Sequence, residues 1–129
     1  MIGVTGASGF IGRHLLAQLG DSGFAVDLRT LDSPDVLSTH LRDNGCRTLV
    51  HLAGPLPGDA GANSVGLELA QRVASAASSL EGCHVIFASS IRVHSRGEGV
   101  FSADSAVAPF DSYGEGKAAA ETALMSCAD

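Results

Sequence analysis

The sequence predicts an α/β domain built on a doubly wound parallel sheet, and three observations lead to this prediction. Short apolar runs rich in β-branched residues alternate along the chain with longer amphipathic segments. A glycine-rich turn joins the first apolar run to the first amphipathic segment. The composition, 45% hydrophobic with 16 glycines and no tryptophan, is typical of a globular α/β chain. We therefore expect a single domain over residues 1–129.

The first strand and the first helix are predicted within the opening part of the chain. Ile2–Thr5 is a short apolar run that ends at the glycine-rich turn. After the turn, Ile11, Leu15 and Leu19 recur every four residues, which is the spacing of one helix face. Gly20 follows as the expected terminator of this helix.

A second extended run is predicted over residues 24–31, and a helix follows it with clear start signals. Ser33 is a good N-cap, and Pro34 suits the first helical position. Leu37 and Leu41 are expected to form the buried face of this helix.

The rest of the chain continues the alternation. A buried strand is predicted over residues 48–54, a helix over 63–80 and another buried strand over 84–89. A long polar loop follows, and the last helix is expected to begin at a cap supplied by Asp111 or Ser112. Strands that alternate with helices in this way predict parallel pairing with right-handed crossovers.

Charge and composition exclude several classes of function. The net charge is -6, and the eight Lys and Arg residues are too scattered to form the patch that nucleic acid requires. No apolar run approaches the length of a membrane span and no signal peptide begins the chain, so we expect a cytoplasmic protein without membrane contact. Cys46, Cys83 and Cys127 lack metal-ligand spacing, and we expect packing roles for them and no metal site.

The glycine-rich turn TGASGFIG predicts a dinucleotide site. Glycines between a first strand and a first helix permit a tight turn and the close approach of a pyrophosphate, and the N–H groups at the helix start attract the anion. The spacing differs from G-x-G-x-x-G, and a merely tight turn is the alternative interpretation. The predicted cofactor contacts in this segment are Gly6, Gly9, Phe10, Ile11 and Gly12.

Two conflicting signals concern the adenosine ribose. An acid roughly 20 residues beyond the glycines favours NAD, whereas an arginine suits the 2′-phosphate of NADP. Asp32 fits the first pattern, Arg29 at the expected end of the second strand fits the second, and Arg13 could also reach. Arg29 could equally be a solvated surface charge. The predicted cofactor is therefore NAD or NADP, without a preference.

A tyrosine and a lysine four residues apart suggest acid/base chemistry. Tyr113 and Lys117 share a helix face, and a nearby ammonium favours the phenolate form of a tyrosine. A phenolate can take a proton from a substrate hydroxyl while a hydride leaves for a nicotinamide. Ser90, expected at the end of a strand, could hydrogen-bond the same oxygen. Taken alone, the pair could also be a surface tyrosine and a solvated lysine.

Five motifs in the same order make the sequence similar to a known family, the extended short-chain dehydrogenases/reductases, or NAD-dependent epimerase/dehydratase group. The glycine motif comes first, and HLAG at residues 51–54 resembles the H-x-A-A or H-x-A-G strand end of the family. NSVG at residues 63–66 resembles its N-x-x-G helix start, and SSIRVHS at residues 89–95 resembles its S-S-x-x-V-Y-G element. The last motif comprises Asp104, Pro109, Tyr113, Lys117 and Glu121.

The resemblance implies a Rossmann-like fold and specific roles for several residues. Leu52 and Ala53 would contact the cofactor, Asp32 resembles the acid near the adenine, and Lys117 would also hold the nicotinamide ribose. Substrates of the family are usually nucleotide-linked sugars, with epimerase, dehydratase or reductase outcomes. The catalytic set that the resemblance implies is Ser90, Tyr113 and Lys117.

The sequence departs from the family pattern in three places. His94 and Ser95 replace the usual Tyr-Gly, one strand is missing between residues 23 and 48 as in the dehydrorhamnose-reductase branch, and the C-terminal substrate lobe is absent. Three interpretations follow: an inactive or shortened enzyme fragment, a non-catalytic dinucleotide-binding or scaffold module, and a small enzyme completed by another subunit. Apolar surface uncovered at the truncated edge would predict a homo-oligomer or a partner chain.

Overall fold

The structure is a computed structural model, which describes residues 1–58, 61–95 and 100–126. A parallel sheet has the strand order β2-β1-β3-β4, which confirms the predicted class and pairing. Its strands are β1 (Ile2–Thr5), β2 (Gly23–Val26), β3 (Thr48–His51) and β4 (His84–Phe87). The helices of the described residues are α1 (Phe10–Leu19), η1 (Gly20–Ser22), α2 (Pro34–Asp43), α3 (Ala62–Ser78), η2 (Ile91–Val93) and α4 (Ser112–Met125), where η1 and η2 are short 3-10 turns.

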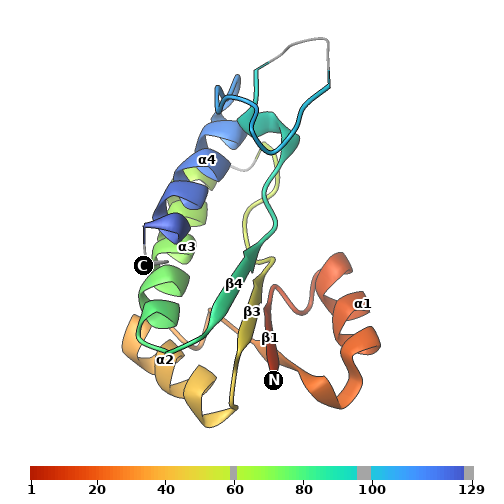
Figure 1. Ribbon diagram of the computed structural model, residues 1–129, viewed down its shortest axis with the longest axis vertical. Coiled ribbons are helices and arrows are strands. Elements are labelled where there is room, and N and C mark those ends of the chain that lie inside the picture. The colour runs from red at the N-terminus through yellow and green to blue at the C-terminus, as the bar shows by residue number, and fades with distance from the viewer. Residues whose placement is uncertain (59–60, 96–99, 127–129) are drawn as a thin grey trace.

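The helices cover the two faces of the sheet unequally (Figure 1). α1 packs on one face, where Leu16 and Leu19 lie against Gly23 of β2. α2 and α3 pack on the other face, and α4 runs beside α3. The main core lies between the sheet and the α2–α3 layer. Its buried residues are Val26, Leu28, Leu37, Leu41, Cys46, Leu49, Val73 and Ala76.

The second strand is shorter than predicted. β2 ends at Val26, whereas the expected extended run continued to residue 31. The chain turns here because the Asp27 carboxylate accepts the backbone N–H of Arg29 at 3.0 Å, and the Asp27 carbonyl accepts the N–H groups of Thr30 and Leu31. Arg29 therefore lies beyond the strand, and Asp27 is the first residue after it.

The start of α2 agrees with the prediction. Ser33 is the N-cap, its Oγ accepts the N–H of Val36 at 3.3 Å, and Pro34 is the first helical residue. Leu37 and Leu41 are fully buried. Local signals were sufficient here because each acts within one turn of the helix.

The later elements follow the predicted order, with shorter strands. β3 ends at His51 and β4 at Phe87, in each case before the predicted limit. α3 spans Ala62–Ser78, in agreement with the predicted helix to within two residues at each end. Asp111, and not Ser112, caps α4, because the Asp111 Oδ1 accepts the N–H of Gly114 at 2.8 Å.

Two cysteines lie in or beside the core, as expected. Cys46 is buried, and Cys83 packs against the same cluster. Burial raises the pKa of the Cys83 thiol to about 11, so the thiol stays protonated near neutral pH. Cys127 lies outside the described residues.

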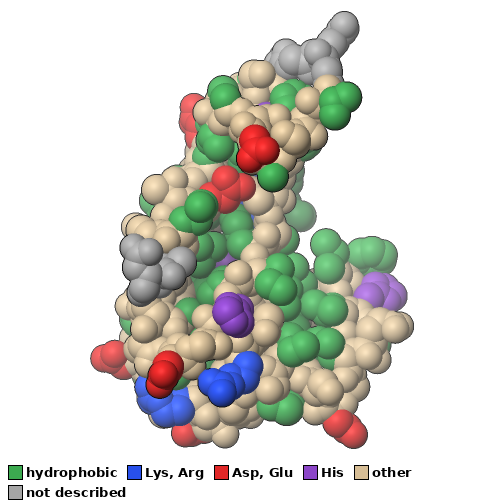
Figure 2. Space-filling view, in the orientation of Figure 1, with side chains coloured by type: hydrophobic (Ala, Val, Ile, Leu, Met, Phe, Trp, Pro, Cys, Tyr) green, Lys and Arg blue, Asp and Glu red, His purple; other side chains and the backbone are tan. Residues whose placement is uncertain are grey.

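Apolar side chains are exposed on the α1 side of the sheet (Figure 2). Val85 of β4 packs against the core, so its neighbour Ile86 points to the opposite face, where it is 57% exposed. Phe10 and Ile11 at the start of α1 are 72% and 61% exposed. A surface of this kind is typical of a protein–protein contact.

Candidate functional site

The glycine-rich turn is as tight as its sequence predicts. The N–H of Gly9 donates to the carbonyl of Gly6 at 3.0 Å, and Gly6 has a φ of +66°, in the left-handed region. A Cβ atom on Gly12 would lie 2.3 Å from the carbonyl oxygen of Gly6. Only glycine therefore lets α1 start so close to the end of β1.

The N-terminus of α1 offers backbone donors to an anion. Gly9 is the N-cap and supplies no side-chain acceptor, and the first helical hydrogen bond runs from the N–H of Arg13 to the carbonyl of Gly9 at 3.1 Å. The N–H groups of Phe10, Ile11 and Gly12 consequently have no acceptor within the helix. Together with the helix dipole, they form a cradle that fits a pyrophosphate.

The glycine turn lies directly against the segment that follows β3. A Cβ atom on Gly6 would lie 2.8 Å from the backbone nitrogen of Ala53 and 2.9 Å from the carbonyl carbon of Leu52. The N–H groups of Leu52 and Ala53 both donate to the Thr5 Oγ1 at 3.1 Å. The structure therefore brings the predicted cofactor contacts Gly6, Leu52 and Ala53 together.

Thr5 also binds a buried histidine, and neither residue was identified as a site residue from the sequence. The Thr5 Oγ1 lies 2.8 Å from the Nδ1 of His51. The Thr5 oxygen already accepts hydrogen bonds from two N–H groups, so the hydroxyl donates its single proton to His51. The Nδ1 of His51 is therefore the unprotonated ring nitrogen. Burial, and to a smaller extent the charge of Lys117, lowers the pKa of His51 to about 4.

This histidine is expected to make the protein sensitive to acid. The folded chain holds His51 with a pKa of about 4, against an ordinary value of 6.5, so between these pH values the unfolded chain binds the extra proton. Stability is therefore complete above the ordinary pKa and is lost as the pH falls toward the folded value. The loss attributable to His51 is roughly 3 kcal/mol, to be measured by urea unfolding at neutral pH and near pH 4.

Two histidine variants isolate this contribution. His51→Asn keeps an acceptor for Thr5 but does not titrate, so its stability should depend less on pH by the same amount. His84→Asn, on the exposed side of β4, is the control and should keep the wild-type pH dependence. Parallel curves for wild type and His51→Asn would contradict the assignment.

Tyr113 and Lys117 lie one turn apart on α4 and approach the end of β4. The Nζ of Lys117 donates to the carbonyl of Ala88 at 2.8 Å and lies 4.6 Å from the ring centroid of Phe87. The same ammonium is 5.8 Å from the centroid of the Tyr113 ring. Burial lowers the pKa of Lys117, and the Glu121 carboxylate partly opposes this effect.

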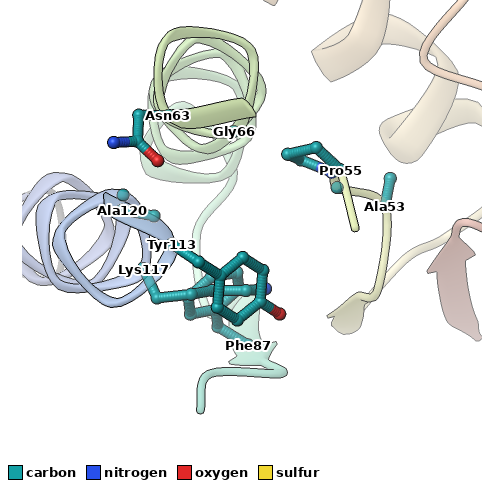
Figure 3. A pocket seen from close by; sticks show the side chains of 10 residues that line it. Ala53, Pro55, Asn63, Gly66, Phe87, Tyr113, Lys117 and Ala120 are labelled. Carbon is teal, nitrogen blue, oxygen red and sulfur yellow. The ribbon is translucent and has the colours of Figure 1, made fainter. Parts of the chain in front are cut away.

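The two side chains line a small cavity between α3, α4 and the segment after β3. Figure 3 shows Tyr113 and Lys117 extending from α4 toward Phe87. The cavity volume is about 20 Å³, which is room for one water molecule, so a larger ligand would lie over its mouth. Its lining residues are Ala53, Gly54, Pro55, Asn63, Gly66, Phe87, Tyr113, Gly116, Lys117 and Ala120.

Small residues allow this close approach of helices. A Cβ atom on Gly116 of α4 would lie 2.7 Å from the Oδ1 of Asn63 on α3. A Cβ atom on Gly54 would lie 3.9 Å from the Nζ of Lys117. Lys117 thus lies beside Gly54. The two residues before Gly54, Leu52 and Ala53, contact the glycine turn.

Ser90 lies beyond β4, not at its end, and does not line the cavity with Tyr113. It is the N-cap of η2, where its Oγ accepts the N–H of Arg92 at 3.3 Å. A serine hydroxyl that accepts one hydrogen bond can still donate its own proton. The guanidinium of Arg92 lies 5.6 Å from the centroid of the Tyr113 ring, so η2 and the start of α4 are adjacent.

The adenosine end of the predicted site lies after β2. Asp27 and Arg29 form a two-pronged ion pair, with the Nε and Nη2 of Arg29 at 2.9 and 2.8 Å from the two carboxylate oxygens. Hydrogen bonds from the side chain and backbone of Arg29 lower the pKa of Asp27 to about 2. Asp32 is exposed, just before the N-cap of α2. The sequence analysis did not single out Asp27, because its place directly after β2 depends on where that strand ends.

Two further properties bear on function. Within residues 1–58, 61–95 and 100–126, no group of three or more His, Cys, Asp or Glu side chains could hold a metal ion. In the same ranges no helix combines the length and the apolar character needed to cross a bilayer.

Known structures share this fold. dTDP-4-dehydrorhamnose reductase from Clostridium acetobutylicum has a TM-score of 0.84 at 20% identity, with 98% of this chain and 49% of the reductase covered. MoeE5, solved in complex with UDP-glucose and NAD, has a TM-score of 0.78 at 29% identity, with coverage of 98% and 48%. A short-chain dehydrogenase/reductase superfamily protein from Agrobacterium tumefaciens, solved with bound NAD, has a TM-score of 0.76 at 26% identity, with coverage of 96% and 44%.

The chain spans about half the length of these solved structures. No curated protein matches the sequence. The family described as NAD dependent epimerase/dehydratase matches residues 2–129, which include the glycine turn, the β3 segment and the Tyr113/Lys117 helix. The chain therefore belongs to the NAD dependent epimerase/dehydratase family.

Proposed function

We propose that this chain is the cofactor-binding and catalytic portion of an NAD(P)-dependent enzyme that acts on a nucleotide-linked sugar. One observation carries the proposal. Gly6 packs on Leu52 and Ala53, and the next residue, Gly54, lies beside Lys117. Residues 52–54 thus contact both the proposed pyrophosphate site and the helix that carries Tyr113 and Lys117.

The residues present fit a dinucleotide. The backbone donors of residues 10–12 would bind the pyrophosphate, and the close backbone contacts of Gly6 and Gly12 keep the turn against the segment after β3 and the start of α1. Leu52 and Ala53 would contact the cofactor along the end of β3. Lys117 would bind the nicotinamide ribose.

The proposed proton transfer would use Tyr113 and Lys117 of α4 and Ser90, the N-cap of η2. When bound, the nicotinamide supplies the acceptor or donor of a hydride. Tyr113 would take the proton of a substrate hydroxyl, and Lys117 lies one helical turn further on, with its Nζ 5.8 Å from the centroid of the Tyr113 ring. Ser90 would donate a hydrogen bond to the same substrate oxygen. This division requires Ser90 and Tyr113 to face one substrate from neighbouring elements.

A direct test is calorimetric titration of the chain with NADH and with NADPH, together with its mass in solution. Saturable binding of either nucleotide supports the cofactor assignment and justifies turnover assays with UDP- and dTDP-linked sugars. A folded chain that binds neither would overturn it. A mass above that of one chain would support a homo-oligomer, whereas the mass of a single chain would leave a partner chain as the occupant of the exposed apolar surface.

NADH is expected to bind more tightly than NADPH. Asp27 lies directly after β2, and its lowered pKa keeps it ionised, so it would accept the ribose hydroxyl and repel a 2′-phosphate. Asp27→Ser should free Arg29 and shift the affinity ratio toward NADPH by about 10-fold or more. Arg29→Ser is the matched variant and should keep the preference for NADH. An unchanged ratio in Asp27→Ser would count against this role and leave Asp32 as the alternative acid.

A second candidate function is a non-catalytic dinucleotide-binding module. The exposed apolar surface beside α1 favours it, because a module of this kind needs a surface for a partner. Saturable NADH binding without turnover of any sugar nucleotide, and with a stable partner complex, would favour this alternative.

A further inference from the structure

Arg92 lies between two parts of the proposed site and contacts both. Its backbone N–H donates to the Ser90 Oγ at 3.3 Å, and its guanidinium lies 5.6 Å from the centroid of the Tyr113 ring. Lys117, on the same helix as Tyr113, lies at 5.8 Å from that centroid. The tyrosine ring is therefore close to two cations, which come from different elements.

An ion pair ties Arg92 to the start of α4. The Nη1 of Arg92 lies 2.9 Å from the Oδ2 of Asp111. The other carboxylate oxygen of Asp111 accepts the N–H of Gly114 at 2.8 Å and caps the helix. One carboxylate thus binds the guanidinium and the first turn of α4 together.

The backbone of Arg92 forms a second contact with the same turn. A Cβ atom on Gly114 would lie 2.2 Å from the carbonyl oxygen of Arg92 and 2.9 Å from its carbonyl carbon. Glycine is thus required for the two segments to approach so closely. The ion pair and this backbone contact hold η2 against α4 on both sides of Tyr113.

We propose that Arg92 is a positioning residue that sets the Tyr113 ring relative to Ser90. Its guanidinium binds the Asp111 carboxylate while its central carbon lies over the Tyr113 ring, and a lysine, with one charged atom, cannot reproduce both contacts. The consequence for turnover rests on the proposed function. The effect on the Tyr113 ring does not rest on the proposed function, because the orientation of the ring can be measured in the protein without cofactor or substrate.

The composition of the chain makes that order measurable. Tyr113 is the single tyrosine, and the chain has no tryptophan. The tyrosine band of the near-ultraviolet circular dichroism spectrum therefore reports on Tyr113 alone. A ring fixed in one asymmetric environment gives a strong band, and a freely rotating ring gives a weak one.

The first variants to compare are Arg92→Met and Arg42→Met. Arg92→Met should largely lose the tyrosine band while its far-ultraviolet spectrum stays that of the wild type. Arg42→Met, which removes an exposed arginine from α2, is the control and should keep the band. A wild-type tyrosine band in folded Arg92→Met would overturn the proposal.

A variant of the partner residue guards against misfolding of Arg92→Met. Asp111→Asn keeps a good N-cap side chain but removes the charge that pairs with Arg92. Retained helix content with a weakened tyrosine band is the expected result. A full band in this variant would show that the ion pair does not position the ring, and would overturn the proposal on its own.

The effect on chemistry is read from kinetics. In Arg92→Met, kcat for a sugar nucleotide should fall roughly 10–100-fold through misplacement of Tyr113, with NADH affinity unchanged. An unchanged kcat together with a lost band would overturn the catalytic part of the inference. Absence of NADH binding by the wild type would instead count against the proposed function, and the dichroism result would still decide the role of Arg92.

Discussion

Replacing Tyr113 with phenylalanine is expected to lower turnover about 100- to 10,000-fold, because proton transfer by a positioned side chain contributes about that factor. Tyr113→Phe removes one oxygen atom and keeps the ring that lies near Lys117 and Arg92. NADH affinity should therefore stay close to the wild-type value. The measurement is kcat with a sugar nucleotide, together with calorimetric titration of NADH.

Ser112→Ala is the matched control for this substitution. Ser112 is exposed, precedes Tyr113 on the same turn of α4, and is not the helix cap. It should leave both kcat and NADH affinity unchanged. Equal turnover by wild type and Tyr113→Phe would sink the catalytic assignment, whereas a loss of NADH binding in Tyr113→Phe would show that the hydroxyl holds the cofactor.

Substituting alanine for Gly6 is expected to destabilise the fold and to weaken cofactor binding together. The left-handed φ of +66° costs a residue with a side chain about 1 kcal/mol. The new Cβ atom would also lie 2.8 Å from the backbone nitrogen of Ala53, which must move. Such overpacking costs roughly 1–3 kcal/mol more, for a total of about 2–4 kcal/mol in the free energy of unfolding.

A comparison with Gly45 separates the cost of the left-handed φ from the cost of the close backbone contact. Gly45 has a similar φ of +58°, but no atom lies within 4 Å of the position of its Cβ atom. Gly45→Ala should therefore cost only about 1 kcal/mol and leave NADH affinity unchanged. In Gly6→Ala the affinity should fall by about 10-fold or more, because the turn and the Leu52–Ala53 backbone shift apart. Equal losses of stability in both variants would show that the close approach carries no cost.

The sequence predicted features that depend on neighbouring residues. The cap at Ser33, the buried Leu37 and Leu41, and the tight turn at Gly6 are each encoded within a few positions. Their physical causes, such as a hydroxyl near a free N–H or the absence of a Cβ atom, act locally. The type and order of the elements followed from the same local patterns.

Features that depend on tertiary contacts were not predictable. The end of β2 was misplaced because a hydrogen bond of Asp27 turns the chain where the apolar pattern continues. The pairing of Thr5 with His51 joins residues 46 positions apart, and the approach of Arg92 to Asp111 joins residues 19 apart. Nothing in a local pattern reports which distant partner satisfies a buried polar group.

The hydroxyl of Thr5 has a consequence for the alignment of the sheet itself. Thr5 is paired with His51 across β1 and β3, and it satisfies the ring nitrogen and the N–H groups of Leu52 and Ala53. A slip of β1 by one residue would put the apolar Val4 in this place and leave all three groups without a partner. The Thr5 side chain therefore favours the observed register of β1 and β3. It does so at the edge of the sheet where the cofactor is proposed to bind. A misaligned sheet would lose stability and the cofactor cradle in the same step.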